Sequence, residues 1–286
     1  MTPKKKILIV DDDTYFHQLL SRILTAVGYK VIETSNVSEA KCALEQLPDL
    51  AIIDYRMPSS NGANFIKELR ENHHKFPIVF CSGSGIDRET FASMVNTFQV
   101  DMIIQKPIHP EMFVQQIAEL FEQQINKASL VAQAAELERN LESSLSAKEE
   151  EEEEEEASSI ENKQFAEDLL NQEHLLAETE AAIAELGCIY LLELPNELEQ
   201  MTTEIQLAAK EGNAISLNKA SYRAHQIKGT SGSLGFDALS QLGSAIEKEL
   251  ITAAKLKLPG EDLKWGEILD LVEQAKTWIE AKQASY

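Results

Sequence analysis

The sequence predicts two folds in one chain: an α/β domain with a doubly wound, five-stranded parallel sheet, followed by an all-α four-helix bundle. Three observations lead to this prediction. Short apolar runs alternate with amphipathic stretches over the first 125 residues, strand signals vanish after Asn126, and helical periodicity continues from there. A length of 286 residues also corresponds to about two domains of roughly 150 residues each.

Five short apolar runs predict the strands of the sheet. Between them lie stretches such as Phe65–Leu69, whose apolar side chains fall on one helical face. Repeats of strand followed by helix imply parallel strands, right-handed crossovers and helices on both faces of the sheet. The five runs are Lys6–Val10, Val31–Ile32, Leu50–Ile53, Ile78–Phe80 and Met102–Ile104.

The acidic excess of the chain is concentrated in its middle. Residues 126–176 hold 15 acidic and 4 basic side chains, which is half of the net charge of −22. Glu149 to Glu156 form an unbroken run, and such like charges indicate a solvated spacer rather than a core element. Before the run, a 3–4 spacing of apolar residues predicts a continuing helix up to about Ser146, with looser chain after it.

Glycine and proline interrupt the helical pattern that follows Ile160, which predicts a bundle of at least four helices. The interruptions are Leu194-Pro195, Gly212-Asn213, Gly235 and Leu258-Pro259-Gly260. We therefore divide the chain into an α/β domain (1–125), a helical and acidic linker (126–160) and a helical bundle (161–286). The leucines of residues 126–146 could pair two copies as a homodimer or dock on the first domain.

Composition narrows the classes of partner and compartment. An excess of 48 acidic over 26 basic side chains repels phosphate backbones and anionic lipid, so we expect neither nucleic acid nor membrane as a partner. Three separated cysteines without a C-x-x-C pair argue against a disulfide framework and fit a reducing compartment. No apolar run approaches the roughly 18 residues of a membrane span. The apolar run at Ile7–Val10 is too short for a signal peptide, so we expect a soluble, cytoplasmic protein.

Carboxylates, a hydroxyl and a lysine follow the predicted strands. In an open parallel sheet the active crevice lies beyond the carboxyl ends of the strands, so these groups should meet there. Hard oxygen ligands predict a Mg²⁺ site, and one carboxylate at its edge can act as a nucleophile toward a phosphoryl donor. Mg²⁺ and the lysine would neutralise charge on the transferring group. The residues are Asp11, Asp12, Asp13, Asp54, Ser82 and Lys106.

This pattern resembles the receiver domain of bacterial response regulators, which has a flavodoxin-like fold. The motifs that carry the resemblance are the acidic pair, Asp54-x-x-Met57-Pro58-x-x-x-Gly62, Ser82 and Lys106-Pro107. The resemblance implies that Asp54 accepts the phosphoryl group and that Ser82 and Lys106 grip its oxygens.

The resemblance also implies the metal ligands. Asp12 would ligate Mg²⁺ directly, Asp11 would help through water, and Asp54 and the carbonyl of Arg56 would complete the site. Asp13 is expected only to cap the helix that follows. The alternative is that these acidic loops merely solvate the strand ends.

Two positions depart from the receiver pattern. Ile103 stands where an aromatic residue is usual, and Gly83 stands where alanine usually follows the switch hydroxyl. Both departures should leave the phosphorylation chemistry in place. They put in question the usual output of receivers, which is coupled through the aromatic residue. A haloacid-dehalogenase-type phosphatase, suggested by Asp11-x-Asp13, would need Thr or Val where Tyr15 stands and would leave Asp54 unexplained.

Among the six histidines, His225 stands out because of the residues that follow it. Lys228 and Gly229 lie at i+3 and i+4, so on a helix they share its face. The lysine can pair with a phosphoryl group on the imidazole, and the glycine leaves room for a partner. A mid-helix glycine costs about 0.5–1 kcal/mol relative to alanine, which suggests that space matters here. The positions expected to face the bundle core, leaving His225 outward, are Ala220, Ala224, Ile227 and Leu234.

The H-x-x-K-G-x-x-x-x-x-G pattern resembles the histidine phosphotransfer (HPt) domain, a four-helix bundle, over residues 175–286. The resemblance implies that His225 is phosphorylated, Lys228 supports it electrostatically and Gly229 provides access. An ordinary surface histidine is the alternative, and a metal site lacks further ligands at usable spacing.

The two resemblances together imply a multistep phosphorelay protein and not an enzyme, because neither domain supplies an ATP site and the phosphoryl group must come from another protein or a small donor. The receiver would promote its own phosphorylation and dephosphorylation. The preferred route runs from a sensor histidine kinase to Asp54, then to His225, then to a downstream response-regulator receiver. A signalling adaptor or phosphate sink, in which Asp54 gates the HPt surface without internal transfer, and a stand-alone hydrolase remain as alternatives.

Overall fold

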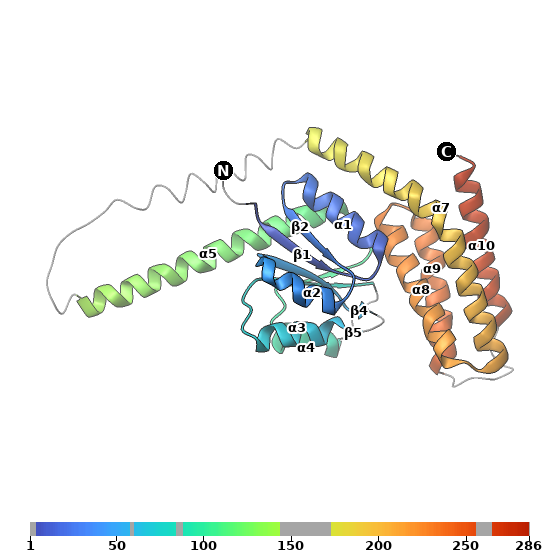
Figure 1. Ribbon diagram of the computed structural model, residues 1–286, viewed down its shortest axis with the longest axis horizontal. Helices are drawn as coiled ribbons and strands as arrows, with labels where there is room; N and C mark the ends of the chain where they lie inside the picture. Colours follow the sequence, from blue (N-terminus) through green and yellow to red (C-terminus); the bar gives the residue numbers. More distant parts are fainter. Residues whose placement is uncertain (1–3, 58–59, 84–87, 144–172, 256–264, 286) are drawn as a thin grey trace.

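The computed structural model describes residues 4–57, 60–83, 88–143, 173–255 and 265–285. A parallel α/β domain comes first, and a helical bundle follows at the carboxyl ends of its strands (Figure 1). Both predicted fold classes are confirmed. Residues 144–160 of the predicted linker, which include the Glu149–Glu156 run, lie outside the described residues.

Five parallel strands form the central sheet, in the order β2-β1-β3-β6-β7. Each contains one of the five predicted apolar runs, and the three inner strands, β1, β3 and β6, are almost fully buried on both faces. The strands are β1 (Lys6–Val10), β2 (Lys30–Thr34), β3 (Leu50–Asp54), β6 (Ile78–Ser82) and β7 (Met102–Gln105). A short antiparallel pair, β4 (Arg56–Met57) and β5 (Ser60–Asn61), was not predicted.

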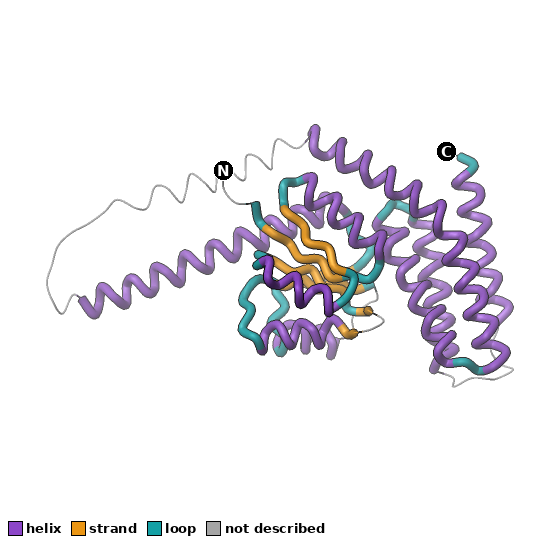
Figure 2. The backbone as a smooth tube through the Cα atoms, viewed as in Figure 1, coloured by secondary structure: helices purple, strands orange, loops and turns teal. Residues whose placement is uncertain are grey.

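Helices cover both faces of the sheet, as Figure 2 shows. Side chains alternate along β1, so Ile7 and Ile9 join the core with α1 and α5, whereas Leu8 and Val10 join the core with α3. The helices are α1 (Thr14–Ala26), α2 (Val37–Ala43) with a 3₁₀ turn (Leu44–Gln46), α3 (Gly62–Glu71), α4 (Arg88–Asn96) and α5 (Pro110–Ser143).

Helix α5 continues well beyond the sheet. Its 34 residues span about 50 Å at 1.5 Å per residue, and its second half projects as a long rod (Figure 1, green). The predicted helical continuation is therefore confirmed as far as Ser143.

Four helices form the bundle: α7 (Glu173–Glu211), α8 (Ala214–Ser233), α9 (Asp237–Lys255) and α10 (Trp265–Gln283). Two predicted breaks are confirmed, and Gly212 and Gly235 stand at them with φ of 62° and 81°. The break predicted at Leu258-Pro259-Gly260 lies outside the described residues.

The break predicted at Leu194-Pro195 is wrong, because α7 runs through Pro195. Proline removes one backbone hydrogen bond, but buried apolar side chains flank it on the same helix. Leu191, Leu194 and Leu198 are at most 2% exposed, and their packing holds the helix together on both sides of the proline.

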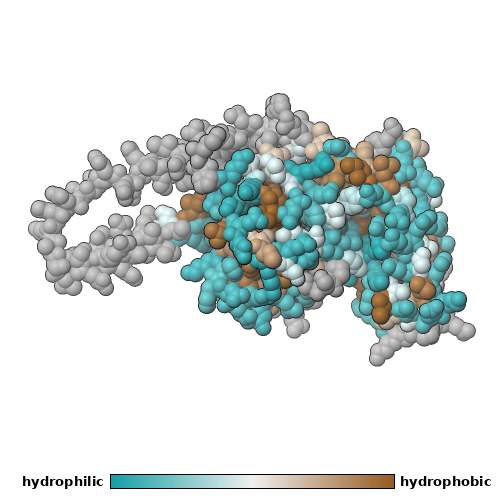
Figure 3. Space-filling view, viewed as in Figure 1, coloured by the Kyte–Doolittle hydropathy of each residue, from teal (hydrophilic) through white to brown (hydrophobic). Residues whose placement is uncertain are grey.

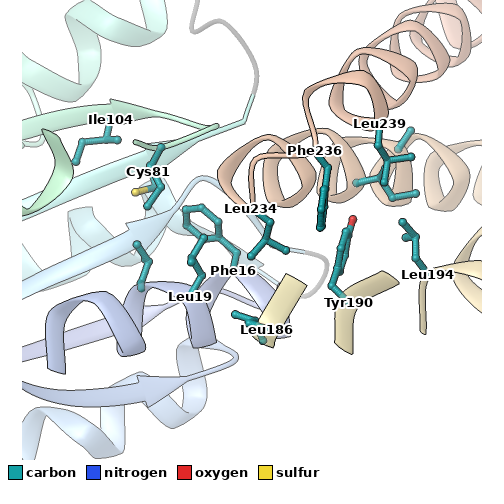
Figure 4. Close-up of a cluster of buried hydrophobic side chains, with 14 of the residues drawn as sticks. Phe16, Leu19, Cys81, Ile104, Leu186, Tyr190, Leu194, Leu234, Phe236 and Leu239 are labelled. Atoms are coloured by element: carbon teal, nitrogen blue, oxygen red, sulfur yellow. The ribbon is translucent and has the colours of Figure 1, made fainter. Parts of the chain in front are cut away.

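One apolar core passes from the α/β domain into the bundle (Figure 4). Phe16 and Leu19 of α1 belong to the same cluster as Leu186 and Tyr190 of α7. The Tyr15 and Tyr190 rings meet edge to face at 5.0 Å between centroids. The two domains are therefore packed against each other, and not merely tethered.

Hydrophilic side chains cover most of the face of the protein in Figure 3, with smaller apolar groups between them. Among the helices of the described segments, none combines the length and apolarity needed to cross a bilayer.

Candidate functional site

The predicted groups at the strand ends do meet. Asp11, Asp12 and Asp54 each offer a carboxylate oxygen, and these oxygens lie within 4.8 Å of one another. Lys106 Nζ lies 2.6 Å from Asp11 Oδ2 and 2.8 Å from Asp54 Oδ1. The backbone nitrogen of Lys106 donates to the carbonyl of Ser82, which joins the ends of β6 and β7.

Burial gives this acidic cluster unusual electrostatics. It raises the pKa of Asp11 well above its ordinary value, and Lys106 offsets this only in part. Burial also raises the pKa of Asp12 to about 6. The pKa of Lys106 is raised because attraction to Asp11 and Asp54 outweighs the effect of its burial. Lys106 therefore balances only part of the negative charge of these carboxylates.

The residues present fit a Mg²⁺ ion. Asp12 Oδ1 is buried, and no hydrogen-bond partner for it exists among the described residues. The Tyr222 hydroxyl donates to Asp12 Oδ2 and lies 3.2 Å from the carbonyl oxygen of Arg56, so these two oxygens face one common space. Carboxylate and carbonyl oxygens are the ligands that Mg²⁺ prefers in proteins. The Asp12 Oδ1 atom, which lacks a hydrogen-bond partner among the described residues, could take such an ion as its partner.

Gly62 positions the loop that follows Asp54. A Cβ on Gly62 would overlap the carbonyl oxygen of Asp54, so only glycine fits at the start of α3. The backbone nitrogen of Arg56 donates to Asp54 Oδ2 at 2.7 Å and orients this carboxylate. The glycine of the predicted motif therefore has a direct steric reason.

Asp13 caps α1, as predicted, by accepting from the backbone nitrogens of Tyr15 and Phe16. Its second oxygen accepts from the hydroxyl of Thr230 in α8. That second contact crosses to the bundle and was not predicted.

His225 lies against the α/β domain. It was predicted to face outward, yet it is only 5% exposed, because the end of β6 packs over its ring. A small cavity between the two domains is lined by both Asp54 and His225, together with Lys106 and Gly229. The predicted core positions Ala220, Ala224, Ile227 and Leu234 are buried, as expected.

Glu247 of α9 organises the surroundings of His225, and sequence reasoning missed it. Its Oε1 lies 2.7 Å from His225 Nδ1 and 3.1 Å from Arg56 Nη1, and its Oε2 lies 3.3 Å from Lys228 Nζ. Burial alone would raise the pKa of Glu247, but His225 and Lys228 lower it to about 2. The sequence did offer one signal for it, because Glu247 is an acidic residue on the apolar, buried face of α9, one turn from Leu250.

Lys228 was predicted to support a phosphorylated His225, and Gly229 was predicted to leave room for a partner. The ammonium of Lys228 pairs with Glu247, at 3.3 Å. A Cβ on Gly229 would lie 3.3 Å from Lys106 Cδ, so this glycine does permit close approach of the first domain.

Comparisons with known proteins agree with this architecture. A model described as the response regulator receiver domain matches residues 7–118, and a model described as the Hpt domain matches residues 185–278. The chain is 33% identical over 113 residues to the chemotaxis protein CheY of Thermotoga maritima, covering 39% of this chain and 92% of that relative.

The chain is also 36% identical over 85 residues to the transcriptional regulatory protein CpxR of Klebsiella pneumoniae, covering 29% of this chain. It spans only 36% of the length of CpxR. A crystal structure of a CheY-like receiver domain protein from Methanospirillum hungatei JF-1 is 27% identical, with a TM-score of 0.40, and the match covers 43% of this chain and 99% of that one. The chain belongs to the response-regulator receiver family and joins its receiver to an Hpt domain, the combination of a two-component phosphorelay protein.

Proposed function

We propose that this protein carries a phosphoryl group on Asp54 and on His225 in turn, and passes it between them within one chain. A sensor histidine kinase would supply the group to Asp54, and a downstream receiver would take it from His225. The observation that carries the proposal is the shared cavity, in which Asp54 and His225 both lie.

Glu247 selects the reactive nitrogen of His225. A carboxylate whose pKa is about 2 is ionised at neutral pH and only accepts hydrogen bonds, so the proton of the neutral imidazole resides on Nδ1. Nε2 then holds the lone pair, and this nitrogen is the one that faces the end of β6.

The transfer step balances with these groups alone. Nε2 of His225 forms a bond to phosphorus while the bond from phosphorus to the Asp54 carboxylate oxygen breaks. The carboxylate leaves with the electron pair, and the Nδ1 proton stays, shared with Glu247. The positive charge that develops on the imidazole is thus balanced by Glu247, as in other sites where a carboxylate orients a histidine.

Lys106 and Ser82 would bind the phosphoryl oxygens at Asp54, since Lys106 Nζ already lies 2.8 Å from that carboxylate. Lys228 would contribute positive charge beside a phosphorylated His225. The ligands of Mg²⁺ would be Asp11, Asp12, Asp54 and the carbonyl of Arg56. When bound, Mg²⁺ neutralises negative charge on the phosphoryl oxygens.

Labelling with acetyl phosphate tests the route. In the wild type, base-labile label on Asp54 should precede acid-labile label on His225, because an acyl phosphate and a phosphoramidate differ in this way. His225→Gln should retain only base-labile label, and Asp54→Asn should acquire neither. Acid-labile label on Asp54→Asn would contradict the proposed order.

A mixture of the two variants tests transfer within one chain. The mixture contains one intact Asp54 and one intact His225 on separate molecules, so its transfer should be slower than in the wild type and should depend on concentration. Equal rates at micromolar concentration would show that the docked arrangement is not used.

One observation favours the adaptor or phosphate-sink alternative. Asp54 and His225 are only 4% and 5% exposed, so neither can reach a second protein while the domains are docked. In that alternative, phosphorylation of Asp54 opens the interface and His225 never receives label from it. The labelling order above separates the two functions.

A further inference from the structure

Gly83 lies at the point where the receiver touches the reactive edge of His225, and it departs from the alanine usual in receivers. We infer that the absence of a side chain at Gly83 is what admits the chain's own HPt histidine to the receiver site. This inference rests on the proposed function and deepens it, because it names the residue whose missing side chain leaves room for His225.

Space, and not backbone conformation, is the reason for glycine here. The described glycines with φ in the left-handed region are Gly28, Gly212 and Gly235, so the backbone at Gly83 suits any L-residue. A Cβ on Gly83 would lie 2.6 Å from His225 Nε2 and 2.7 Å from Cε1. Real Cβ atoms do not approach other heavy atoms so closely, so alanine would require something to move.

The imidazole has little freedom to retreat. Its Nδ1 is held at 2.7 Å by Glu247, and that carboxylate is held in turn by Arg56 and Lys228. A rotation of the ring away from Gly83 would break the Glu247 contact in a buried site.

The helix that carries His225 is also fixed on the receiver. The backbone nitrogen of Ile108 donates to Ser233 Oγ at 3.0 Å, and Thr230 donates to Asp13. On its other side, α8 packs so closely on α9 that a Cβ on Gly243 would lie 2.9 Å from the backbone of Lys228. A side chain at Gly83 therefore has to separate the two domains.

The receiver itself tolerates the extra methyl group. The three atoms nearest to a Cβ on Gly83 all belong to His225, and none belongs to the acidic cluster or to Lys106. Gly83→Ala should thus leave the residues of the acidic cluster in place while it prevents docking.

The test uses the full chain and two readouts. The amide of Ile108 reports docking by hydrogen exchange, because its acceptor Ser233 belongs to the bundle. Acetyl phosphate labelling reports Asp54 and His225 separately. In Gly83→Ala we expect labelling of Asp54 at least as strong as in the wild type, and a roughly 5- to 150-fold loss of both Ile108 protection and label transfer to His225.

Two further variants keep the test sharp. Gly266→Ala is the matched control, because a Cβ there would meet nothing within 4 Å, and it should behave as wild type in both readouts. In a His225→Ala background the clash disappears, so adding Gly83→Ala should no longer reduce Ile108 protection. A reduction of the same size in that background would overturn the inference.

The outcomes separate this inference from the proposed function. Undiminished Ile108 protection and transfer in Gly83→Ala would overturn the inference and leave the relay standing. Absence of His225 label even in the wild type would overturn the relay, while Ile108 protection would still decide whether Gly83 admits His225.

Discussion

Replacing Tyr222 with phenylalanine removes one oxygen from the interface between the receiver and the HPt domain and leaves the ring in place. That hydroxyl donates to Asp12 Oδ2 and lies 3.2 Å from the carbonyl oxygen of Arg56. These two oxygens are also proposed ligands of Mg²⁺. The hydroxyl and the ion therefore compete for the same oxygens, and Tyr222→Phe should bind Mg²⁺ more tightly than the wild type.

The size of the effect follows from the bond that the ion has to displace. A hydrogen bond to a charged group contributes about 1.5–3 kcal/mol. At 1.4 kcal/mol per tenfold, full competition would tighten the dissociation constant of Mg²⁺ by about ten- to a hundredfold. Partial opening of the interface in the wild type would reduce this factor toward its lower end.

Calorimetric titration of Mg²⁺ into the full chain measures the effect. Tyr29→Phe is the matched control, because the Tyr29 hydroxyl is buried without a hydrogen-bond partner among the described residues and its ring stacks on Phe121, away from the acidic cluster. Unchanged or weaker Mg²⁺ binding by Tyr222→Phe would refute the competition, and weaker binding would mean that the hydroxyl helps to hold the ion.

Three more predictions follow from the same interface and site. Glu247, with its pKa lowered to about 2, should contribute about 3 kcal/mol of stability above pH 5; this contribution should disappear as the pH falls toward 2, so urea titrations of wild type and Glu247→Gln should converge in acid. Leu186→Ala, in the core shared by both domains, should cost about 2–5 kcal/mol of unfolding free energy, whereas Leu192→Ala, which is 71% exposed, should cost under about 0.5 kcal/mol; equal losses would contradict the packing. Chelation of divalent cations with EDTA should abolish labelling of Asp54 by acetyl phosphate, and labelling that survives EDTA would remove Mg²⁺ from the proposed site.

Local periodicity was enough to predict most of the fold. A strand buried on both faces needs an uninterrupted apolar run, so the three inner strands are clear in the sequence, whereas the edge strands β2 and β7 show only short runs. The meeting of Asp11, Asp54 and Lys106 was also predictable, because parallel strands bring their carboxyl ends to one edge. The predicted break at Pro195 was wrong, because packing on both sides of a proline can outweigh the loss of one hydrogen bond.

By itself, then, the sequence determined the two folds, the carboxylate cluster at the sheet edge and a histidine with a lysine and a glycine on one helical face. Only the tertiary structure decided that the two sites face each other. The contacts that hold them, Tyr222 to Asp12 and Arg56 to Glu247, join residues 210 and 191 positions apart. Local sequence periodicity does not encode such pairs, because they depend on how the surfaces of two folded domains fit together. In the same way, the role of Gly83 becomes clear only when His225 is seen to pack against it.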